Sequence, residues 1–276
     1  MEKILALCKE INLPVEMVQK VEVTAKTLDI APFAEHMEAL LSEETAKGAY
    51  EAIASVLDSM GGDQGGYILL TIYLITALRT REMYAEKGIE DSIFIETIKS
   101  LTRFSLEHKV TFDEYGFDRA WWMYRHLSLN LFRLGVLEFE MKHEDDILSV
   151  HIPSDAIMTR EALDASYAWA KRFFAEYFSH FSNKSIECNT WLLSPSLKNL
   201  LPTGSKILNF AADYEILSSE PDAQSFMMWV YKKEYPDIDS LPEDTSLQRA
   251  IKRHLHMGGK IGDARGKYTQ EQKHIS

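Results

Sequence analysis

The hydrophobic and polar residues of this chain follow two different periods. In the first half, apolar residues recur every three or four positions, as in Ile4, Leu5, Cys8 and Ile11, which is typical of helices with one buried face. Residues 67–78, YILLTIYLITAL, form the most apolar run but are too few to span a bilayer, so they predict a buried helix. We therefore expect a helical domain over residues 1–134, in which residues 117–135 form the last helix.

From Gly135 the period changes to two. Residues 136–141 and 147–152 alternate apolar and polar side chains around the polar turn KHEDD, which predicts a β-hairpin. Residues 163–178 return to helical spacing with a broad aromatic face, and residues 186–193 read as a further strand. Two strands joined by a helical crossover of this length are normally parallel, and ligands of such sheets gather where the strands end.

The last part of the chain is expected to continue this mixed domain. Residues 225–233, SFMMWVYKK, alternate as a strand, and Asp244 or Thr245 can cap a basic helix after it. Residues 258–268, GGKIGDARGKY, lack the spacing and the preceding strand of a phosphate-binding loop, and we interpret them as a flexible terminus. The fold class is α+β: a helical domain over residues 1–134, and a mixed sheet with flanking helices over residues 135–276.

Charge and cysteine content narrow the classes of function. The formal net charge of -12 disfavours a nucleic-acid-binding protein, because neutralising phosphates requires a basic surface. Two distant cysteines, Cys8 and Cys188, suit a reducing compartment, and the amino-terminal residues show no secretory signal, so we expect a cytoplasmic protein without a membrane segment. No sequence motif of a serine hydrolase, a zinc protease or a dinucleotide-binding protein is present, and we expect no metal.

Several short motifs carry a family resemblance. The expected elements follow the order hairpin, helix, strand, helix, strand. The motifs read with this order are HIP, CNTWLLSP, SKILNF, WVY and LPEDTSLQR, at residues 151–153, 188–195, 205–210, 229–231 and 241–249. With them the chain resembles bacterial GNAT-like acyltransferases that join a helical amino-terminal domain to a GNAT-like carboxyl-terminal domain. The resemblance implies an acyl-CoA (acetyl-CoA) co-substrate whose acyl group is transferred to an amine.

The resemblance also implies where the acyl-CoA binds. The strand before the long helix would hydrogen-bond the pantetheine arm, and the loop after it would surround the pyrophosphate at the helix N-terminus. On this chain the corresponding residues are Ile152, Pro153, Ser154, Thr159, Arg160 and Trp191. The usual glycine-rich turn is missing, and Asp155 and Glu161 bring negative charge, so the segment can equally be a plain strand-to-helix turn capped by Thr159.

Direct transfer needs a base for the attacking amine and an acid for the leaving thiolate. The candidate bases are Glu187 and His151, followed by Glu138 and Glu140. The two hairpin glutamates can instead form a solvated strand face, and His151 can be a hydrogen-bonded structural residue. The resemblance puts Asn209 near the position where many relatives have the tyrosine that acts as the acid, and Tyr214 lies further along, so Tyr214 is a candidate but the acid role stays unassigned. Cys188 is either a covalent acceptor or a small core residue.

Two functions from different classes remain at this point. The first is an acyl-CoA-dependent N-acyltransferase that acts on a small-molecule amine or a peptide. The second is a catalytically inactive protein of the same fold that binds an acyl-CoA, another small ligand or a protein partner. The missing glycine-rich turn and the missing tyrosine at Asn209 favour the second function.

Overall fold

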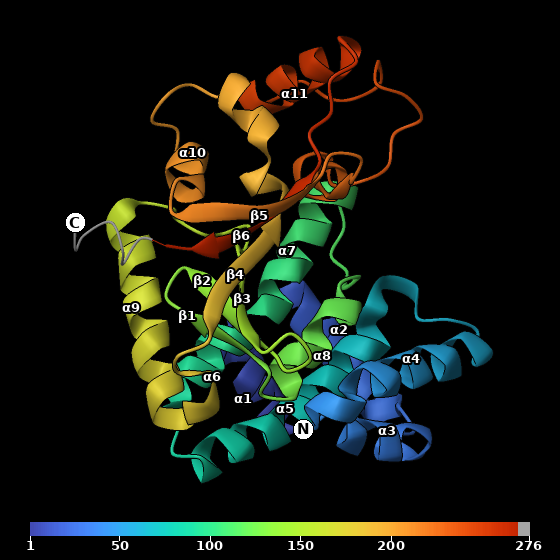
Figure 1. Ribbon diagram of the computed structural model, residues 1–276. Helices are drawn as coiled ribbons and strands as arrows, with labels where there is room; N and C mark the ends of the chain where they lie inside the picture. The colour runs from blue at the N-terminus through green and yellow to red at the C-terminus, as the bar shows by residue number, and fades with distance from the viewer. Residues whose placement is uncertain (270–276) are drawn as a thin grey trace. The chain divides into compact units, whose positions relative to one another are not determined.

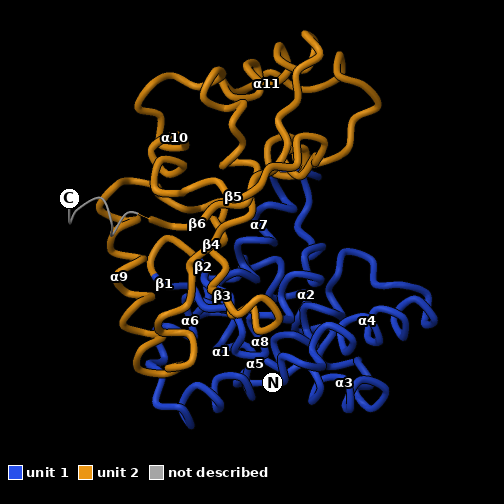
Figure 2. The backbone as a smooth tube through the Cα atoms, in the orientation of Figure 1, with its two compact units in different colours: residues 1–134, 138–140 blue, residues 135–137, 141–276 orange. Residues whose placement is uncertain are grey.

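A computed structural model of the chain describes residues 1–269, which form two compact units. Unit 1 contains residues 1–134 and 138–140, and unit 2 contains residues 135–137 and those from 141 onward (Figure 2). Unit 1 is mostly helical, and unit 2 contains most of the sheet (Figure 1).

Unit 1 is built around one buried helix. Its helices are α1 Glu2–Glu10, α2 Val15–Thr27, α3 Ala34–Ala39, α4 Glu43–Ser59, α5 Tyr67–Glu86, α6 Asp91–Ile98, α7 Ser100–Phe112 and α8 Ala120–Leu127. Helix α5 contacts α1, α2, α3, α6 and α8, and its residues 69–74 are all buried. The prediction of a buried helix over residues 67–78 is therefore confirmed. No helix of residues 1–269 is both long and apolar enough to cross a membrane.

The helix predicted over residues 117–135 is shorter than expected. Helix α8 ends at Leu127, Leu129 takes a left-handed conformation with φ of 54°, and strand β1 Leu131–Leu134 follows. Leucines at 127, 131 and 134 fit both a helix and a strand, so the apolar spacing did not distinguish them. Pairing within the sheet decides in favour of the strand, because it satisfies the backbone groups of this buried segment.

The sheet has six strands in the order β1-β2-β3-β4-β6-β5. After β1 they are β2 Leu137–Lys142, β3 Ile147–His151, β4 Ser185–Thr190, β5 Tyr214–Glu220 and β6 Asp263–Tyr268. The hairpin prediction is confirmed by β2 and β3, and the predicted parallel crossover is confirmed because β3 and β4 are parallel and joined by α9 Arg160–Tyr177. Strand β6 runs antiparallel to both β4 and β5. Helices α10 Lys206–Ala211 and α11 Ser246–His256 complete unit 2.

The strand predicted over residues 225–233 is wrong. Met227–Tyr231 form a turn of π-helix in which Phe226 and Tyr231 are buried, while Met228 and Trp229 are exposed. The Tyr231 hydroxyl donates to the Gln248 carbonyl of α11, which holds this turn against the helix. Five positions separate Phe226 and Tyr231, a spacing that the wide turn of a π-helix brings to one side.

The flexible terminus predicted over residues 258–268 is also wrong. Asp263–Tyr268 form β6, which lies between β4 and β5 and hydrogen-bonds to both. A segment with three charged residues becomes an inner strand because two ladders satisfy its backbone groups, and because Arg265 pairs with Glu187 of β4. The predicted helix cap at Thr245 is confirmed by a capping box with Gln248. The end of the polar tail, residues 270–276, lies outside the described residues.

Candidate functional site

The pairing of the parallel strands β3 and β4 ends part of the way along their length. Their register runs from Ile147 beside Ser185 to Ser149 beside Glu187 and stops there. Beyond that point β3 continues to His151, whereas β4 continues to Thr190 paired with β6. The end of this pairing, which we call the strand opening, is the place where an extended ligand could lie between two strands of the sheet.

The two leading base candidates lie on the same face of the sheet at the strand opening. Partners in register share a face and neighbours alternate, so Ser149, Glu187 and His151 point to one side. Val150 and Cys188 point to the other side, and both are buried. The structure thus brings Glu187 and His151 together on one face, which their separation in the sequence left undetermined.

Glu187 is buried and paired with a cation. Only 8% of the residue is exposed, and its Oε2 atom accepts a hydrogen bond of 2.6 Å from Arg265 Nε of β6. Lys267 lies directly opposite Glu187 in the β4–β6 register. Arg265 was not among the predicted site residues because it lies in the segment interpreted as a terminus, and nothing in the local sequence pattern indicated a strand there.

The loop after β3 leads into the start of helix α9. Pro153 is buried, Ser154 is exposed, and the Ala156 amide donates to the Pro153 carbonyl over 3.0 Å. Thr159 caps the helix, because its side chain accepts a hydrogen bond of 3.3 Å from the Ala162 amide. The predicted cap is therefore confirmed, and the positive end of the helix dipole lies beside the loop.

Arg160, the expected phosphate ligand, is held by two carboxylates of unit 2. Its guanidinium lies 2.6 Å from Asp213 Oδ2 and 2.7 Å from Asp164 Oδ1. Burial alone would lower the pKa of Arg160, but the hydrogen bonds to Asp213 and Asp164 raise it above the usual value. Any anion bound by Arg160 would share it with these carboxylates.

Tyr214 lies at the start of β5. Its hydroxyl is 2.5 Å from the hydroxyl of Tyr167 on α9, and it is opposite Tyr268 in the β5–β6 register. The rings of Tyr167 and Tyr268 are stacked with centroids 3.9 Å apart. Asn209 is exposed on α10, and its amide donates to the Gly204 carbonyl. Sequence reasoning did not find Tyr167 and Tyr268, because one lies on a helix face interpreted as core and the other in the supposed terminus.

Burial raises the pKa of both Tyr167 and Tyr214 well above the usual value for tyrosine. The hydrogen bond between them acts in opposite directions on the two groups, since it lowers the pKa of Tyr167 and raises that of Tyr214. Both hydroxyls are therefore protonated at neutral pH.

The remaining strand residues are less suited to chemistry. Burial raises the pKa of the Cys188 thiol far above neutral, which disfavours a nucleophilic thiolate. Trp191 is buried in the 3₁₀ turn η4 Trp191–Leu193, which replaces the end of the predicted strand over residues 186–193. Thr190 begins this turn, because its side chain accepts a hydrogen bond from the Leu192 amide.

The solvated face proposed for Glu138 and Glu140 is wrong. Both are 2% exposed and lie within unit 1, where Glu138 is 2.8 Å from Arg103 and Glu140 is 3.0 Å from Arg125. Burial alone would raise the pKa of Glu138, but Arg103 and His126 together lower it well below the usual value. The lowered pKa keeps Glu138 ionised within its ion pair at neutral pH.

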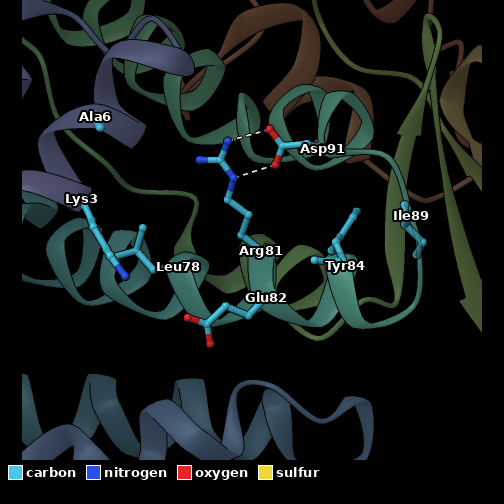
Figure 3. A pocket seen from close by; sticks show the side chains of 9 residues that line it. Lys3, Ala6, Leu78, Arg81, Glu82, Tyr84, Ile89 and Asp91 are labelled. Atoms are coloured by element: carbon cyan, nitrogen blue, oxygen red, sulfur yellow. Dashed lines mark hydrogen bonds and ion pairs between the residues drawn. The ribbon is translucent and has the colours of Figure 1, made fainter.

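Unit 1 contains a separate surface pocket of about 420 Å³ (Figure 3). It lies along α1, α5 and the start of α6, and its lining includes Lys3, Leu78, Arg81 and Asp91. Two nitrogens of Arg81 donate to the two carboxylate oxygens of Asp91, each over 2.6 Å (Figure 3). Within residues 1–269, no group of three histidine, cysteine, aspartate or glutamate side chains is placed to hold a metal ion.

Both halves of the chain match models of known protein families. Residues 2–129 match the family model described as N-acyltransferase N-terminal domain, and residues 131–268 match the one described as GNAT-like C-terminal domain. No curated protein matches the sequence.

Solved structures share the fold over nearly the whole chain. An acyltransferase in complex with decanoyl-CoA and teicoplanin is 24% identical, with a TM-score of 0.77 over 98% of this chain and 88% of that one. An acyltransferase in complex with CoA and 10C-teicoplanin is 23% identical, with a TM-score of 0.77 over 96% and 86% of the two chains. A mutant acyltransferase in complex with octanoyl-CoA is 23% identical, with a TM-score of 0.78 over 98% and 88%.

Proposed function

The chain belongs to the GNAT-like acyltransferases that carry an N-acyltransferase N-terminal domain, and we propose that it transfers an acyl group from acyl-CoA to an amine by direct attack at the strand opening. The observation that carries this proposal is the end of the β3–β4 register at Ser149 and Glu187. There a thioester could lie between the strands with Glu187 and His151 on one face of the sheet. Tyr214, the candidate acid, lies on the opposite face of the sheet.

The reaction begins with proton removal from the amine. Glu187 or His151 accepts a proton from the attacking nitrogen as the nitrogen forms a bond to the thioester carbon. The ion pair with Arg265 orients the Glu187 carboxylate and makes it available again after the proton has left. Backbone groups of β3 and β4 beyond their shared register can orient the pantetheine amides and the thioester oxygen.

The second half of the reaction breaks the carbon–sulfur bond. The electron pair of that bond goes to sulfur, and Tyr214 donates the proton that converts the thiolate into a thiol. The resulting phenolate regains a proton from solvent. Because the Tyr214 hydroxyl is protonated at neutral pH, it begins each turnover in the form that an acid requires.

The N-terminus of α9 supports an acyl-CoA site. Amides at the start of a helix and the dipole behind them attract phosphate, and Arg160 lies in the first turn. Asp213 and Asp164 oppose this attraction through their ion pairs with Arg160. The pyrophosphate is therefore expected to bind mainly to backbone amides around residues 153–161, with Arg160 as a shared cation.

The donor and acceptor classes can be proposed from the comparisons and from charge. Of the solved acyltransferases, one was bound to decanoyl-CoA and teicoplanin, one to CoA and 10C-teicoplanin, and a mutant to octanoyl-CoA. For this chain we propose an acyl-CoA donor and a small-molecule amine acceptor. The net charge of -12 favours an acceptor that carries positive charge in solution.

The test of this function combines binding and turnover. Thermal unfolding would be measured with CoA, acetyl-CoA and octanoyl-CoA, since a ligand that binds only the folded protein raises the midpoint. Free thiol release would then be followed with a panel of amines for the wild type and for Glu187→Gln and His151→Asn. A midpoint shift with turnover that either variant lowers by about 100-fold supports the proposal. No shift and no turnover at saturating acyl-CoA would reject it.

A second function is favoured by the engagement of Arg160 with Asp164 and Asp213. If the same assay gives a midpoint shift but no thiol release with any amine, the chain is an acyl-CoA-binding protein that retained the acyltransferase fold.

Glu215→Gln is the matched control for Glu187→Gln in the turnover assay, because Glu215 and Glu187 both lie opposite Lys267 of β6, on β5 and β4 respectively.

A further inference from the structure

One amine of the chain itself lies beside a base candidate of the proposed reaction. Lys267 of β6 is directly opposite Glu187 of β4, at the level where the pairing of β3 and β4 ends. The proposed reaction transfers an acyl group to an amine at this level, and a lysine side chain ends in a nucleophilic amine. We infer that Lys267 is a self-acylation site, at which the protein transfers the acyl group of acyl-CoA to its own lysine.

Lys267 and Glu187 project from the same face of the sheet. Strands β4 and β6 are neighbours (Figure 1), and residues in register point to one side. The Cβ atoms of residues that lie directly opposite in an antiparallel pair are about 4.5–5.5 Å apart. The long and flexible side chain of Lys267 can therefore bring its nitrogen within hydrogen-bond distance of the Glu187 carboxylate.

The amine of Lys267 is accessible. The residue is exposed, and its ammonium group forms no hydrogen bond or ion pair with another described residue, although Glu187 and Glu215 lie opposite it on the two neighbouring strands. The Glu187 carboxylate is held instead by Arg265, which lies two positions before Lys267 on the same face. Glu187 thus has its own cation, and no structural ion pair has to break before Lys267 reacts.

Direct transfer sets two conditions on an attacking amine. The nitrogen has to lie within hydrogen-bond distance of the base, and it has to lie close to the thioester carbon. The strand register meets the first condition for Lys267 with Glu187 as the base. The second condition follows from the proposed function, in which the thioester lies at the strand opening beside the same glutamate.

The step is the one proposed for an external amine, with Lys267 as the acceptor. Its ammonium group first loses a proton to solvent, and the neutral nitrogen then forms a bond to the thioester carbon. Glu187 accepts the second proton from the nitrogen, the carbon–sulfur bond breaks with its electron pair going to sulfur, and the thiolate takes up a proton. The products are an amide at Lys267 and free CoA. Because the amide is stable, it is an end product and not an intermediate on the way to another acceptor.

This inference rests on the proposed function, and its test separates the two. The wild type would be incubated with acetyl-CoA without any added amine, and acetylation of each lysine would be followed over time by peptide mass spectrometry. Lys47, which is exposed on α4, is the reference for reaction of a lysine with acetyl-CoA in solution. The variants are Glu187→Gln, which removes the base, and Glu215→Gln, which removes the other glutamate opposite Lys267.

Lys267 should be acetylated at least about tenfold faster than Lys47, because an amine held beside the base and the thioester reacts faster than a free one. Glu187→Gln should lower the rate at Lys267 to about that of Lys47, whereas Glu215→Gln should leave the ratio of the two rates close to that of the wild type. A fast reaction at Lys267 that Glu187→Gln leaves unchanged would overturn the inference.

Two further outcomes distinguish the inference from the proposed function. If the wild type acylates added amines but modifies Lys267 no faster than Lys47, the inference is overturned and the proposed function stands. A wild type that acylates neither Lys267 nor any added amine would reject the proposed function and the inference with it.

A competition experiment on the wild type provides the second test if Glu187→Gln does not fold. An analogue of CoA that lacks the thiol would occupy the donor site without reacting. At saturation it should suppress acetylation of Lys267 by about tenfold or more, while Lys47 continues to react at its solution rate. Acetylation of Lys267 at the same rate with and without the analogue would overturn the inference.

Discussion

The Cys188 thiol donates a hydrogen bond of 3.2 Å to the Val150 carbonyl across the point where the pairing of β3 and β4 ends. The contact fixes the role of this cysteine. Its thiol is buried and used as a donor, and burial raises its pKa far above neutral, so the fraction of thiolate is negligible in solution at neutral pH. Cys188 is therefore a spacer between the strands, and direct transfer does not need a covalent acyl-enzyme.

The first prediction concerns the activity and stability of the variant Cys188→Ala. Acyl transfer should stay within about threefold of the wild-type rate, because the substitution removes no group that accepts an acyl chain, whereas losing a covalent nucleophile costs several orders of magnitude. The free energy of unfolding should fall by about 1 kcal/mol through the lost packing and hydrogen bond. Steady-state kinetics and urea unfolding check both numbers, and a rate reduced more than about 1,000-fold would contradict direct transfer.

The second prediction concerns the carboxylates around Arg160. Asp213→Asn removes one competitor for the guanidinium, so the affinity for CoA should rise severalfold, while Arg160→Glu should reduce it by about tenfold or more. Titration calorimetry with CoA at low and high salt measures both changes. Arg172→Glu, on the same helix but three turns from its N-terminus, makes the same charge change and should leave CoA affinity close to that of the wild type.

A third prediction concerns the pH dependence of stability in unit 1. His126 is fully buried beside Glu138, Arg103 and Arg125, and burial lowers its pKa below the usual value. The unfolded chain then binds a proton more readily than the folded one. The contribution of neutral His126 to the free energy of unfolding is therefore fully present above a pH of about 6.5 and is lost as the pH falls. The free energy of unfolding changes by at most about 1.4 kcal/mol per pH unit through this group.

Protonation of Glu138 also lowers the stability of the folded protein, but at lower pH. Its pKa is lowered in the folded state, so its contribution is present above the unfolded value of about 4.3 and is lost on further acidification. His126→Leu should therefore flatten the dependence of unfolding free energy on pH between 7.5 and 5.5, where Glu138 does not contribute. Urea unfolding at four pH values measures this slope, and a variant as steep as the wild type would show that another group is responsible.

A fourth prediction tests the inner position of β6. A Cβ atom on Gly266 would lie 3.0 Å from Leu193 Cδ1 and 3.0 Å from Tyr214 Cβ, closer than carbon atoms normally approach. Gly266→Val should lower the free energy of unfolding by about 1–3 kcal/mol through overpacking. The control is Gly48→Ala in α4, where an added Cβ meets nothing within 4 Å and alanine favours the helix. Thermal unfolding of both variants should move in opposite directions.

The sequence by itself determined the parts of this protein that depend on neighbours along the chain. The helical period of residues 1–134 and the buried helix over residues 67–78 follow from local spacing, as do the hairpin before residue 152 and the parallel crossover. The caps at Thr159 and Thr245 were predictable for the same reason, because a cap bonds to an amide three positions away.

Tertiary structure decided what depends on partners far apart in the chain. Asp263–Tyr268 became an inner strand only because β4 and β5 pair with it, and that pairing set Arg265 beside Glu187. The contact between Tyr167 and Tyr214 likewise spans 47 positions, and the buried partners of Glu138 lie on helices of unit 1. The spacing of apolar residues along the sequence indicates which side of a helix or strand is apolar. The energies of pairing between distant segments decide which polar groups become buried together.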